Sequence, residues 1–158
     1  MKKGLILGRF QPLHMGHLSL FESVIDDGNE LLICIGSSNE KRTENNPYNS
    51  LERTKMIKSV LSNYDCKYDI FEIPDINNNE LYVKHLESMV PKFDLVYSGN
   101  DIVKMLFENA GYSVIIPNLI NREAWQGASI RQAMKDGDGW EMDVPASVAN
   151  IISEIELS

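Results

Sequence analysis

The side chains best suited to chemistry lie near the start of the chain, in Gly8-Arg9-Phe10-Gln11-Pro12-Leu13-His14-Met15-Gly16-His17. His14 and His17 are three residues apart, a spacing that puts both imidazoles on one face of a first helical turn. The unpaired backbone N–H groups of such a turn attract anions, and Arg9 adds a positive charge nearby. Gly16 has no side chain, so a nucleotide can approach the backbone closely. The segment therefore predicts a phosphate site that stabilises charge developing during a reaction.

Two simpler interpretations compete with this one. Histidines at this spacing can bind a metal, but such a site needs further Cys, His or carboxylate ligands that the segment lacks, so we predict no metal held by protein side chains. A lone histidine is usually a capping or core residue, whereas His14 and His17 occur together. The third histidine of the chain, His85, is expected to be a surface or packing residue.

The elements that must position these residues follow from the apolar pattern, which alternates between short runs and longer stretches of helical spacing. Each short run is rich in Ile, Val, Leu or aromatic residues, as in strands buried on both faces. The predicted strands are residues 4–7, 31–36, 68–73, 94–97 and 113–116. Apolar residues three and four apart predict helices around 18–25, 56–61, 86–90, 102–107 and 148–155.

This alternation predicts the fold class. We expect one α/β domain over residues 1–158, with a Rossmann-like, doubly wound parallel sheet of five strands and helices on both faces. Asn49 followed by Glu52 is the pattern of a capping box at a helix start. Gly28 and Gly111 are expected to end helices.

In such a sheet, ligands bind outside the carboxyl ends of the strands, where the strand order reverses. The candidate binding segments are therefore those that follow the predicted strands: 8–17, 37–42, 74–76 and 98–101. The polar stretches 37–49 and 76–80 are predicted loops. The first is long for this fold, which makes it either functional or mobile.

Length and charge narrow the class of protein further. A chain of 158 residues suffices for about one domain. Lys plus Arg number 15 against 23 Asp plus Glu, a formal net charge of −8 that argues against nucleic-acid binding. No apolar run approaches the roughly 18 residues of a membrane helix. Cys34 and Cys66 form no CxxC pair, so we expect two reduced thiols in a cytoplasmic protein.

The segment around the two histidines resembles the HxGH nucleotidyltransferases. Its longer form, GRFQPxHxGH, is similar to that of the nicotinamide mononucleotide (NMN) adenylyltransferases of archaeal type. Further stretches resemble this family in matching order: Ile35-Gly36-Ser37-Ser38, Asn46-Pro47-Tyr48, Glu52-Arg53, Pro74-Asp75-Ile76 and Tyr97-Ser98-Gly99-Asn100. The resemblance implies the nucleotidyltransferase fold, which is shared with adenine nucleotide alpha hydrolases, and a reaction of ATP with NMN that gives NAD and pyrophosphate.

The resemblance also implies roles for particular residues. Catalysis is expected of His14, His17 and Arg131. ATP is expected to contact Gly8, Arg9, Phe10, His14, Gly16, His17, Ser98, Gly99, Asn100, Arg122, Gly127, Ser129, Ile130 and Arg131. NMN is expected at Ser37, Asp75, Ile76 and Tyr82, and the candidate additional phosphate contacts are Lys41 and Arg42.

The same resemblance carries expectations about cofactor and partners. Mg²⁺ is expected to be held mainly by the ATP phosphates. The expected partners are ATP and NMN or NAD, without nucleic acid or membrane. The chain is expected to form a homo-oligomer, commonly a hexamer in this family.

The chain departs from the family pattern in two places. Gln126-Gly127-Ala128-Ser129-Ile130-Arg131 stands where the family has Ser-Gly-Thr-x-Ile/Val-Arg, so two hydroxyls expected near the ATP phosphates are missing. Ser129 is the candidate substitute, one position later. Tyr82 stands where the archaeal relatives place a Trp that stacks on nicotinamide, and a Tyr ring keeps an aromatic face for stacking. Tyr82 is nearly as compatible with an ordinary half-buried helix position.

Two other functions compete at this point. One is adenylyl or cytidylyl transfer to another phosphate substrate, such as pantetheine phosphate or FMN, and Gln11 together with Arg9 argues against it. The other is a non-catalytic nucleotide-binding sensor on the same fold. His14 and His17 argue against a sensor, whereas Ala128 favours it.

Overall fold

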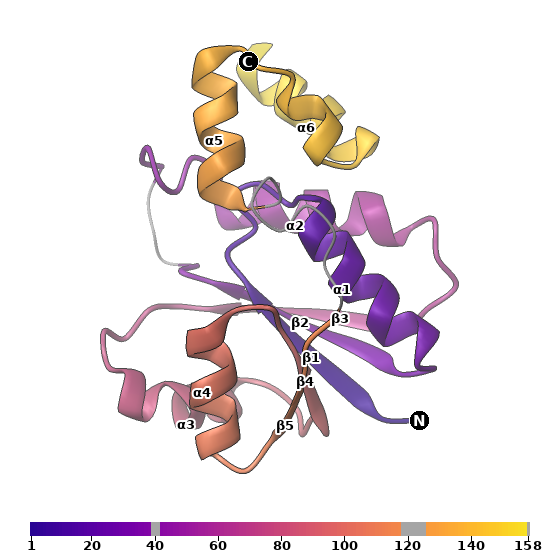
Figure 1. The fold of residues 1–158 in the computed structure, drawn as a ribbon, viewed down its shortest axis with the longest axis vertical. Coiled ribbons are helices and arrows are strands. Elements are labelled where there is room, and N and C mark those ends of the chain that lie inside the picture. Colours follow the sequence, from indigo (N-terminus) through magenta and orange to yellow (C-terminus); the bar gives the residue numbers. More distant parts are fainter. Residues whose placement is uncertain (39–41, 118–125, 158) are drawn as a thin grey trace.

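The computed structural model describes residues 1–38, 42–117 and 126–157 of the chain. Within these residues the centre is a five-stranded parallel sheet with strand order β3-β2-β1-β4-β5 (Figure 1). The strands are β1 (Lys3–Gly8), β2 (Glu30–Gly36), β3 (Tyr68–Ile73), β4 (Leu95–Tyr97) and β5 (Ser113–Ile115). All five predicted strands are confirmed, and no predicted bound differs from the observed one by more than about one residue.

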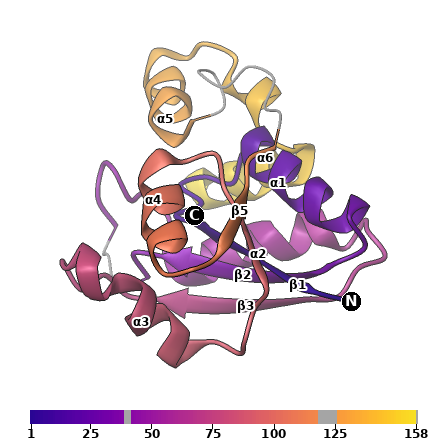
Figure 2. The ribbon, with the colours of Figure 1, turned by 60° about the horizontal axis from the view of Figure 1, so that its bottom comes forward.

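Helices cover both faces of the sheet. They are α1 (Met15–Asp26), α2 (Ser50–Leu61), α3 (Asn79–Met89), α4 (Asp101–Asn109), α5 (Gly127–Asp136) and α6 (Ala146–Leu157), with a short 3-10 turn at Trp140–Asp143. α1, α2 and α6 pack on one face, and α3 and α4 on the other (Figure 1). Figure 2 shows α5 and α6 on the side of the sheet that carries α1 and α2, away from α3. The predicted doubly wound fold is confirmed.

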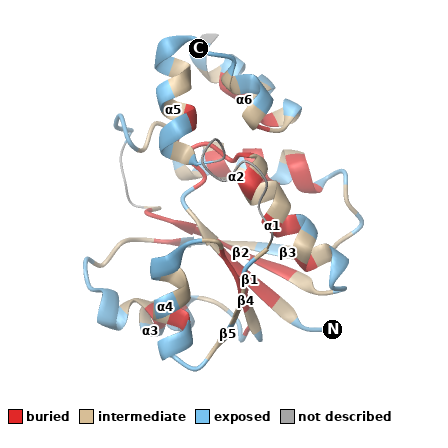
Figure 3. Ribbon diagram, in the orientation of Figure 1, coloured by how far each residue is buried: buried red, intermediate tan, exposed pale blue. Residues whose placement is uncertain are grey.

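The sheet separates two apolar cores. Ile6 and Ile33 face the core that contains α1, α2 and α6, whereas Leu5 and Leu32 face the core under α3 and α4. Successive residues of a strand point to opposite faces, so each central strand supplies both cores. Figure 3 shows the central strands buried and the outer faces of the helices exposed. No helix within the described ranges has the length and apolar character needed to cross a membrane.

β1 lies where the strand order reverses. The chain runs from β1 to β2 and β3 on one side, and then crosses back to β4 and β5 on the other. Ligands of doubly wound sheets bind at the carboxyl ends of the strands around this point. Residues 8–17 follow β1 and residues 98–101 follow β4, so the sheet topology places both segments there.

Three helix ends lie where the sequence predicts them. Asn49 accepts a hydrogen bond from the backbone of Glu52, whose carboxylate accepts one from the backbone of Asn49, so the capping box of α2 is present. Gly28 and Gly111 follow α1 and α4 with φ angles of 75° and 96°. These left-handed angles favour glycine at a helix C-terminus.

The prediction of a loop over residues 76–80 is wrong for its last two residues, Asn79 and Glu80, which belong to α3. α3 begins at Asn79, because the side chain of Asn78 accepts a hydrogen bond from the backbone N–H of Leu81 at 3.2 Å and caps the helix. Val83 and Leu86 then bury one face of α3 in the core. The Asn-rich stretch is therefore a helix start as well as a loop.

Candidate active site

The two histidines form the N-terminal cap of α1. His14 is the N-cap residue, and its Nδ1 accepts a hydrogen bond from the backbone N–H of Gly16 at 3.1 Å. His17 is the third helical residue, and its Nδ1 accepts from the backbone N–H of His14 at 3.0 Å. The rings stack with their centroids 3.8 Å apart. The imidazoles therefore meet at one helix start, as their spacing predicts, and take the places usually held by Ser or Thr and Glu in a capping box.

Both imidazoles are neutral near pH 7. Burial, and then the charge of Arg131, lowers the pKa of His14 to about 4. Burial, and then the neighbouring His14, holds the pKa of His17 well below its ordinary range. Because Nδ1 of each ring accepts a backbone hydrogen, the single proton of each neutral ring is on Nε2. The pair thus presents two Nε2–H donors without a cost for burying charge.

Phe10 and Gly8 set the surroundings of His17. Phe10 is fully buried, and its ring packs against the imidazole of His17 with the centroids 4.4 Å apart. Its φ of 53° is left-handed, a strained conformation that persists where the surrounding structure fixes it. A Cβ atom at Gly8 would lie 3.2 Å from the ring of Phe10 and 3.3 Å from Nε2 of His17, so glycine lets both rings pack closely against the end of β1.

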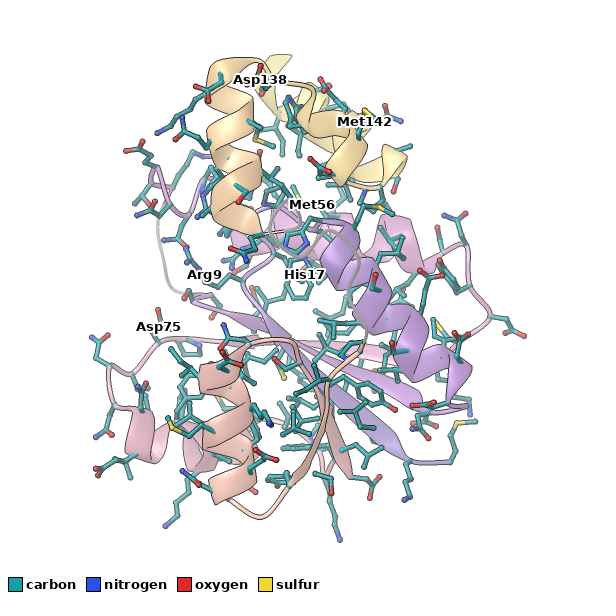
Figure 4. All side chains as sticks on the ribbon, in the orientation of Figure 1. Arg9, His17, Met56, Asp75, Asp138 and Met142 are labelled. Carbon is teal, nitrogen blue, oxygen red and sulfur yellow. The ribbon has the colours of Figure 1, made fainter. Side chains whose placement is uncertain are left out.

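Arg9 and Arg131 bring two guanidinium groups to the same turn. Arg131 Nη1 donates to the backbone oxygen of Gln11 at 2.7 Å. Arg9 Nη2 donates to the backbone oxygen of Asn45 at 2.7 Å and to the side-chain oxygen of Asn46. Figure 4 shows Arg9 and His17 at the same end of the sheet, below α5. Guanidinium groups in this position suit the oxygens of a polyphosphate.

The start of α5 is shaped around Arg131. A Cβ atom at Gly127 would lie 2.8 Å from Nη1 of Arg131, so glycine is what lets this side chain fold back over the helix start. The N-cap residue Gln126 makes no side-chain capping hydrogen bond. A helix start without a side-chain cap is suited to an anion.

The departures from the family signature lie on the outer side of α5. Ala128 and Ser129 are exposed, whereas the adjacent Ile130 is 1% exposed and belongs to the core. Ile130 therefore anchors the helix through packing. The role of Ser129 as a replacement hydroxyl remains a prediction.

Gln11 is a part of the site whose structural role the sequence did not reveal. It is 2% exposed, and its side chain is hydrogen-bonded to the backbone of Tyr48 in the loop before α2. Its own carbonyl holds Arg131. A polar side chain between buried residues of the turn was the only available signal, because its partners are far away in the sequence.

The residues expected to bind NMN meet at the ends of β2 and β3. Ser37 Oγ donates to a carboxylate oxygen of Asp75 at 2.8 Å. Tyr82 lies in the first turn of α3, the helix that follows the loop after β3, and burial, then the charge of Asp75, raises its pKa to about 12. Ile76 is half-buried in the same loop. Their contacts with NMN remain predictions.

His85 lies under the same loop. Its Nε2 is 3.3 Å from the backbone oxygen of Pro74, and its ring centroid is 6.3 Å from that of Tyr82. These contacts make His85 a packing residue, one of the two settings predicted for it.

The segment after β4 forms the start of α4. The side chain of Asn100 accepts hydrogen bonds from the backbones of Ile102 and Val103, at 2.9 and 3.1 Å. Ser98 is 4% exposed and its hydroxyl accepts from the backbone of Asn100. Ser98, Gly99 and Asn100 thus shape the turn beside β1, and their ATP contacts remain predictions.

Arg42, one of the two additional phosphate contacts proposed for the loop after β2, forms hydrogen bonds within the protein in this structure. Arg42 donates to both carboxylate oxygens of Glu52 at 3.0 Å, and to the backbone oxygen of Pro47 at 2.8 Å. Arg42 therefore braces the loop against α2 in this structure. The other two expected phosphate contacts, Lys41 and Arg122, lie outside the described residues.

The donor set at this turn suits an anion. Among the described residues, no group of three His, Cys, Asp or Glu side chains is placed to hold a metal ion. The side-chain groups at the start of α1 are N–H donors, which bind phosphate oxygens and not cations. A divalent ion therefore fits this site as part of bound ATP.

Sequence comparison identifies the family. The family model described as cytidylyltransferase-like matches residues 5–133. The nicotinamide-nucleotide adenylyltransferase of Methanosphaerula palustris is 41% identical over 156 residues, which cover 99% of this chain and 93% of that protein. The proteins of the same name from Picrophilus torridus and Pyrococcus furiosus are each 40% identical; the matches cover 98% of this chain and 92% and 85% of those proteins.

Solved structures share the fold. A bifunctional NMN adenylyltransferase/ADP ribose pyrophosphatase from Francisella tularensis matches 91% of this chain with a TM-score of 0.77 at 18% identity. A structure of such an enzyme from the same organism with AMP and a manganese ion matches with a TM-score of 0.72 at 19% identity. The matches span 45% and 44% of those longer chains, less than half of their length. On the sequence relatives and the shared fold together, this chain belongs to the nicotinamide-nucleotide adenylyltransferases of archaeal type, within the cytidylyltransferase-like family.

Proposed function

We propose that this chain transfers AMP from ATP to NMN and so forms NAD and pyrophosphate. The observation that carries the proposal is the stacked pair of neutral imidazoles, His14 and His17, at a helix start beside Arg9 and Arg131. Two N–H donors and two guanidinium groups fit a triphosphate whose transfer needs positioning and charge stabilisation. The relatives named above, which carry the name of this activity, support the same conclusion.

The proposed reaction needs no protein base. The NMN phosphate is already an anion near pH 7, so one of its oxygens attacks the α-phosphorus of ATP directly. The new P–O bond forms as the bond to the bridging oxygen of the β-phosphate breaks, and that electron pair leaves with pyrophosphate. Negative charge grows on the α-phosphate oxygens and on the leaving group during this step.

We assign the side chains at the turn to the stabilisation of this growing negative charge. His17 Nε2–H donates to an α-phosphate oxygen, because Nδ1 of the same ring already accepts the backbone N–H of His14. His14, Arg9 and Arg131 hold the rest of the triphosphate. Donors that are fixed in place before the reaction stabilise growing charge without reorganising.

NMN is assigned to the loops after β2 and β3. Ser37 donates to the carboxylate of Asp75, and Tyr82 lies in the first turn of the helix that follows this loop. An aromatic ring in this position can stack on nicotinamide, and the backbone near Asp75 and Ile76 supplies polar contacts. Mg²⁺, held by the phosphates of ATP, would supply charge neutralisation for the leaving pyrophosphate.

Liquid chromatography tests this proposal with one acceptor at a time. The purified chain is incubated with ATP, Mg²⁺ and either NMN, pantetheine phosphate or FMN. We expect NAD and an equal amount of pyrophosphate from NMN, and no adenylylated product from the other two. Product from another acceptor alone would assign a different transferase activity. ATP binding without pyrophosphate release would make the chain a nucleotide sensor.

We also propose that the chain acts as a homo-oligomer, up to a hexamer, in the cytoplasm. Ile102 and Met105 on α4 are 58% and 52% exposed, so they offer apolar surface for association. Cys34 and Cys66 are both free thiols, as in reducing compartments. Light scattering is expected to give a multiple of the 17.9 kDa chain mass, and a monomer at all concentrations would contradict this.

A further inference from the structure

Arg53 is a buried cation at the edge of the site that the reaction described above does not use. It projects from α2, and its side chain is fully buried. Nη1 donates to the backbone oxygens of Arg9 at 3.0 Å and Gly36 at 2.9 Å, and Nη2 donates to that of Ser37 at 3.3 Å. A single guanidinium therefore joins the chain just after β1 to the end of β2.

The partners of Arg53 are unusual for a buried charge. Buried arginines are normally paired with a carboxylate. Within the described residues, all hydrogen bonds of Arg53 go to neutral oxygens, including Asn49 O and Ser50 Oγ of its own helix start. Burial, and then the charge of Arg9, lowers its pKa, and the charge of Glu72, to which it makes no hydrogen bond among those described, opposes this shift. The planar fork of donors is thus retained where its charge has a cost.

The carbonyls that Arg53 holds belong to two strained positions. Phe10 follows the Arg9 carbonyl and has a φ of 53°, and Ser37 lies between two of the bonded carbonyls and has a φ of 52°. Left-handed residues other than glycine persist where their surroundings over-determine them. Arg53 supplies such surroundings at both positions simultaneously.

These two positions belong to different halves of the site. Phe10 packs against His17 in the phosphate turn, and Ser37 holds Asp75 in the loop assigned to NMN. We propose that Arg53 is a positioning residue that fixes the distance between the ATP turn and the NMN loop, and so aligns the NMN phosphate with the α-phosphate of ATP. This inference rests on the proposed function. Arg53 itself contacts neither substrate.

Loss of the Arg53 side chain is expected to slow turnover without weakening the binding of either substrate. Each half of the site keeps its own side chains without Arg53, whereas the distance between the halves changes. A misplacement of about 1 Å can cost about 100-fold in rate. We therefore expect Arg53→Ala to lower kcat by about 10- to 100-fold, while the KM values for ATP and NMN change little.

Chemical rescue distinguishes this role from a purely structural one. Arg53→Ala leaves a cavity of the shape of guanidinium, so millimolar guanidinium is expected to restore kcat saturably, whereas equal sodium chloride is not. Arg53→Lys keeps a charge but has one ammonium for three carbonyls, so its kcat is expected to stay low. The matched control is Lys55→Ala on the same helix, where Lys55 is exposed and paired with Glu154, and its kcat is expected to match the wild type.

Each other outcome overturns the proposal. Full kcat in Arg53→Lys would show that charge alone suffices. Loss of activity in folded Arg53→Ala without guanidinium rescue, or unfolding of both variants by circular dichroism, would make Arg53 a stability residue. The wild type is assayed first: if it makes no NAD, the proposed function fails and this inference fails with it. NAD formation by the wild type together with fully active Arg53→Ala defeats this inference alone.

Discussion

The side-chain amide of Gln11 pairs with the backbone of Tyr48 much as a neighbouring strand would. Gln11 Nε2 donates to the backbone oxygen of Tyr48 at 2.8 Å, and the backbone nitrogen of Tyr48 donates to Gln11 Oε1 at 2.9 Å. The main-chain oxygen of Gln11 also accepts a hydrogen bond from Arg131 at 2.7 Å. One residue of the phosphate turn therefore holds both the loop before α2 and the arginine of α5.

Replacing Gln11 by Ala is expected to damage both stability and ATP binding. The change leaves the N–H and C=O of Tyr48 without partners, and each unsatisfied buried group costs about 1–3 kcal/mol. The free energy of unfolding in urea should thus fall by about 2–6 kcal/mol, and the KM for ATP should rise. Gln132→Ala, at an exposed position on α5, is the control and is expected to change stability by less than about 0.5 kcal/mol. Equal behaviour of the two variants would show that the Gln11 pairing contributes nothing.

Arg131 is expected to serve ATP more than NMN. A hydrogen bond to a charged group contributes about 1.5–3 kcal/mol, so Arg131→Ala should raise the KM for ATP by about 10- to 100-fold. The KM for NMN should change far less, because the residues proposed to bind NMN lie at the ends of β2 and β3. Steady-state kinetics with each substrate varied in turn measures the difference. An equal rise in both KM values would place Arg131 outside the ATP site.

Gly127→Ala provides a second test of whether Arg131 binds ATP. The added Cβ would lie 2.8 Å from Nη1 of Arg131, so the guanidinium must move while the helix is retained. We expect thermal stability to be preserved and the KM for ATP to rise. An unchanged KM would show that the present position of Arg131 does not matter for ATP.

Protonation of His14 is expected to destabilise the fold at acid pH. The unfolded chain binds a proton on this group below about pH 6.5, whereas the native pKa is about 4. The unfolded state therefore binds more protons between these values, and the free energy of unfolding falls by about 3 kcal/mol as pH decreases from 7 to 4. His14→Asn removes the titrating group and keeps a capping oxygen for α1. Urea titrations at several pH values should show a smaller acid loss in this variant, and identical losses would contradict the neutral imidazole.

The local features of the fold were predictable from the sequence. The strands are short apolar runs, and the ends of α1, α2 and α4 are marked by Gly28, Asn49 and Gly111, so each signal lies within the element that it defines. The meeting of His14 and His17 was predictable for the same reason, since they are three positions apart in one helical turn. The start of α3 was missed because an Asn run suits both a loop and a helix cap.

The long-range contacts of the site were not predictable in this way. The bond from Arg131 to Gln11 joins residues 120 apart, and the bonds from Arg53 to Arg9 and Gly36 join residues 44 and 17 apart. No periodicity encodes such pairs, because they arise only when the sheet brings different loops to one edge. The salt bridge of Arg42 with Glu52 was likewise not predictable, and the phosphate contact expected of Arg42 remains a prediction.

The rate of NAD formation by wild type and His17→Ala, measured side by side with saturating ATP, NMN and Mg²⁺, tests the central claim most directly. If the neutral Nε2–H of His17 stabilises charge on the α-phosphate, the wild type forms NAD and the variant loses about 100- to 1000-fold in kcat. ATP affinity, measured by calorimetry on the same samples, should stay close to that of the wild type, because the guanidinium groups still hold the triphosphate. A near-full kcat in His17→Ala, or no NAD from the wild type, would contradict the account.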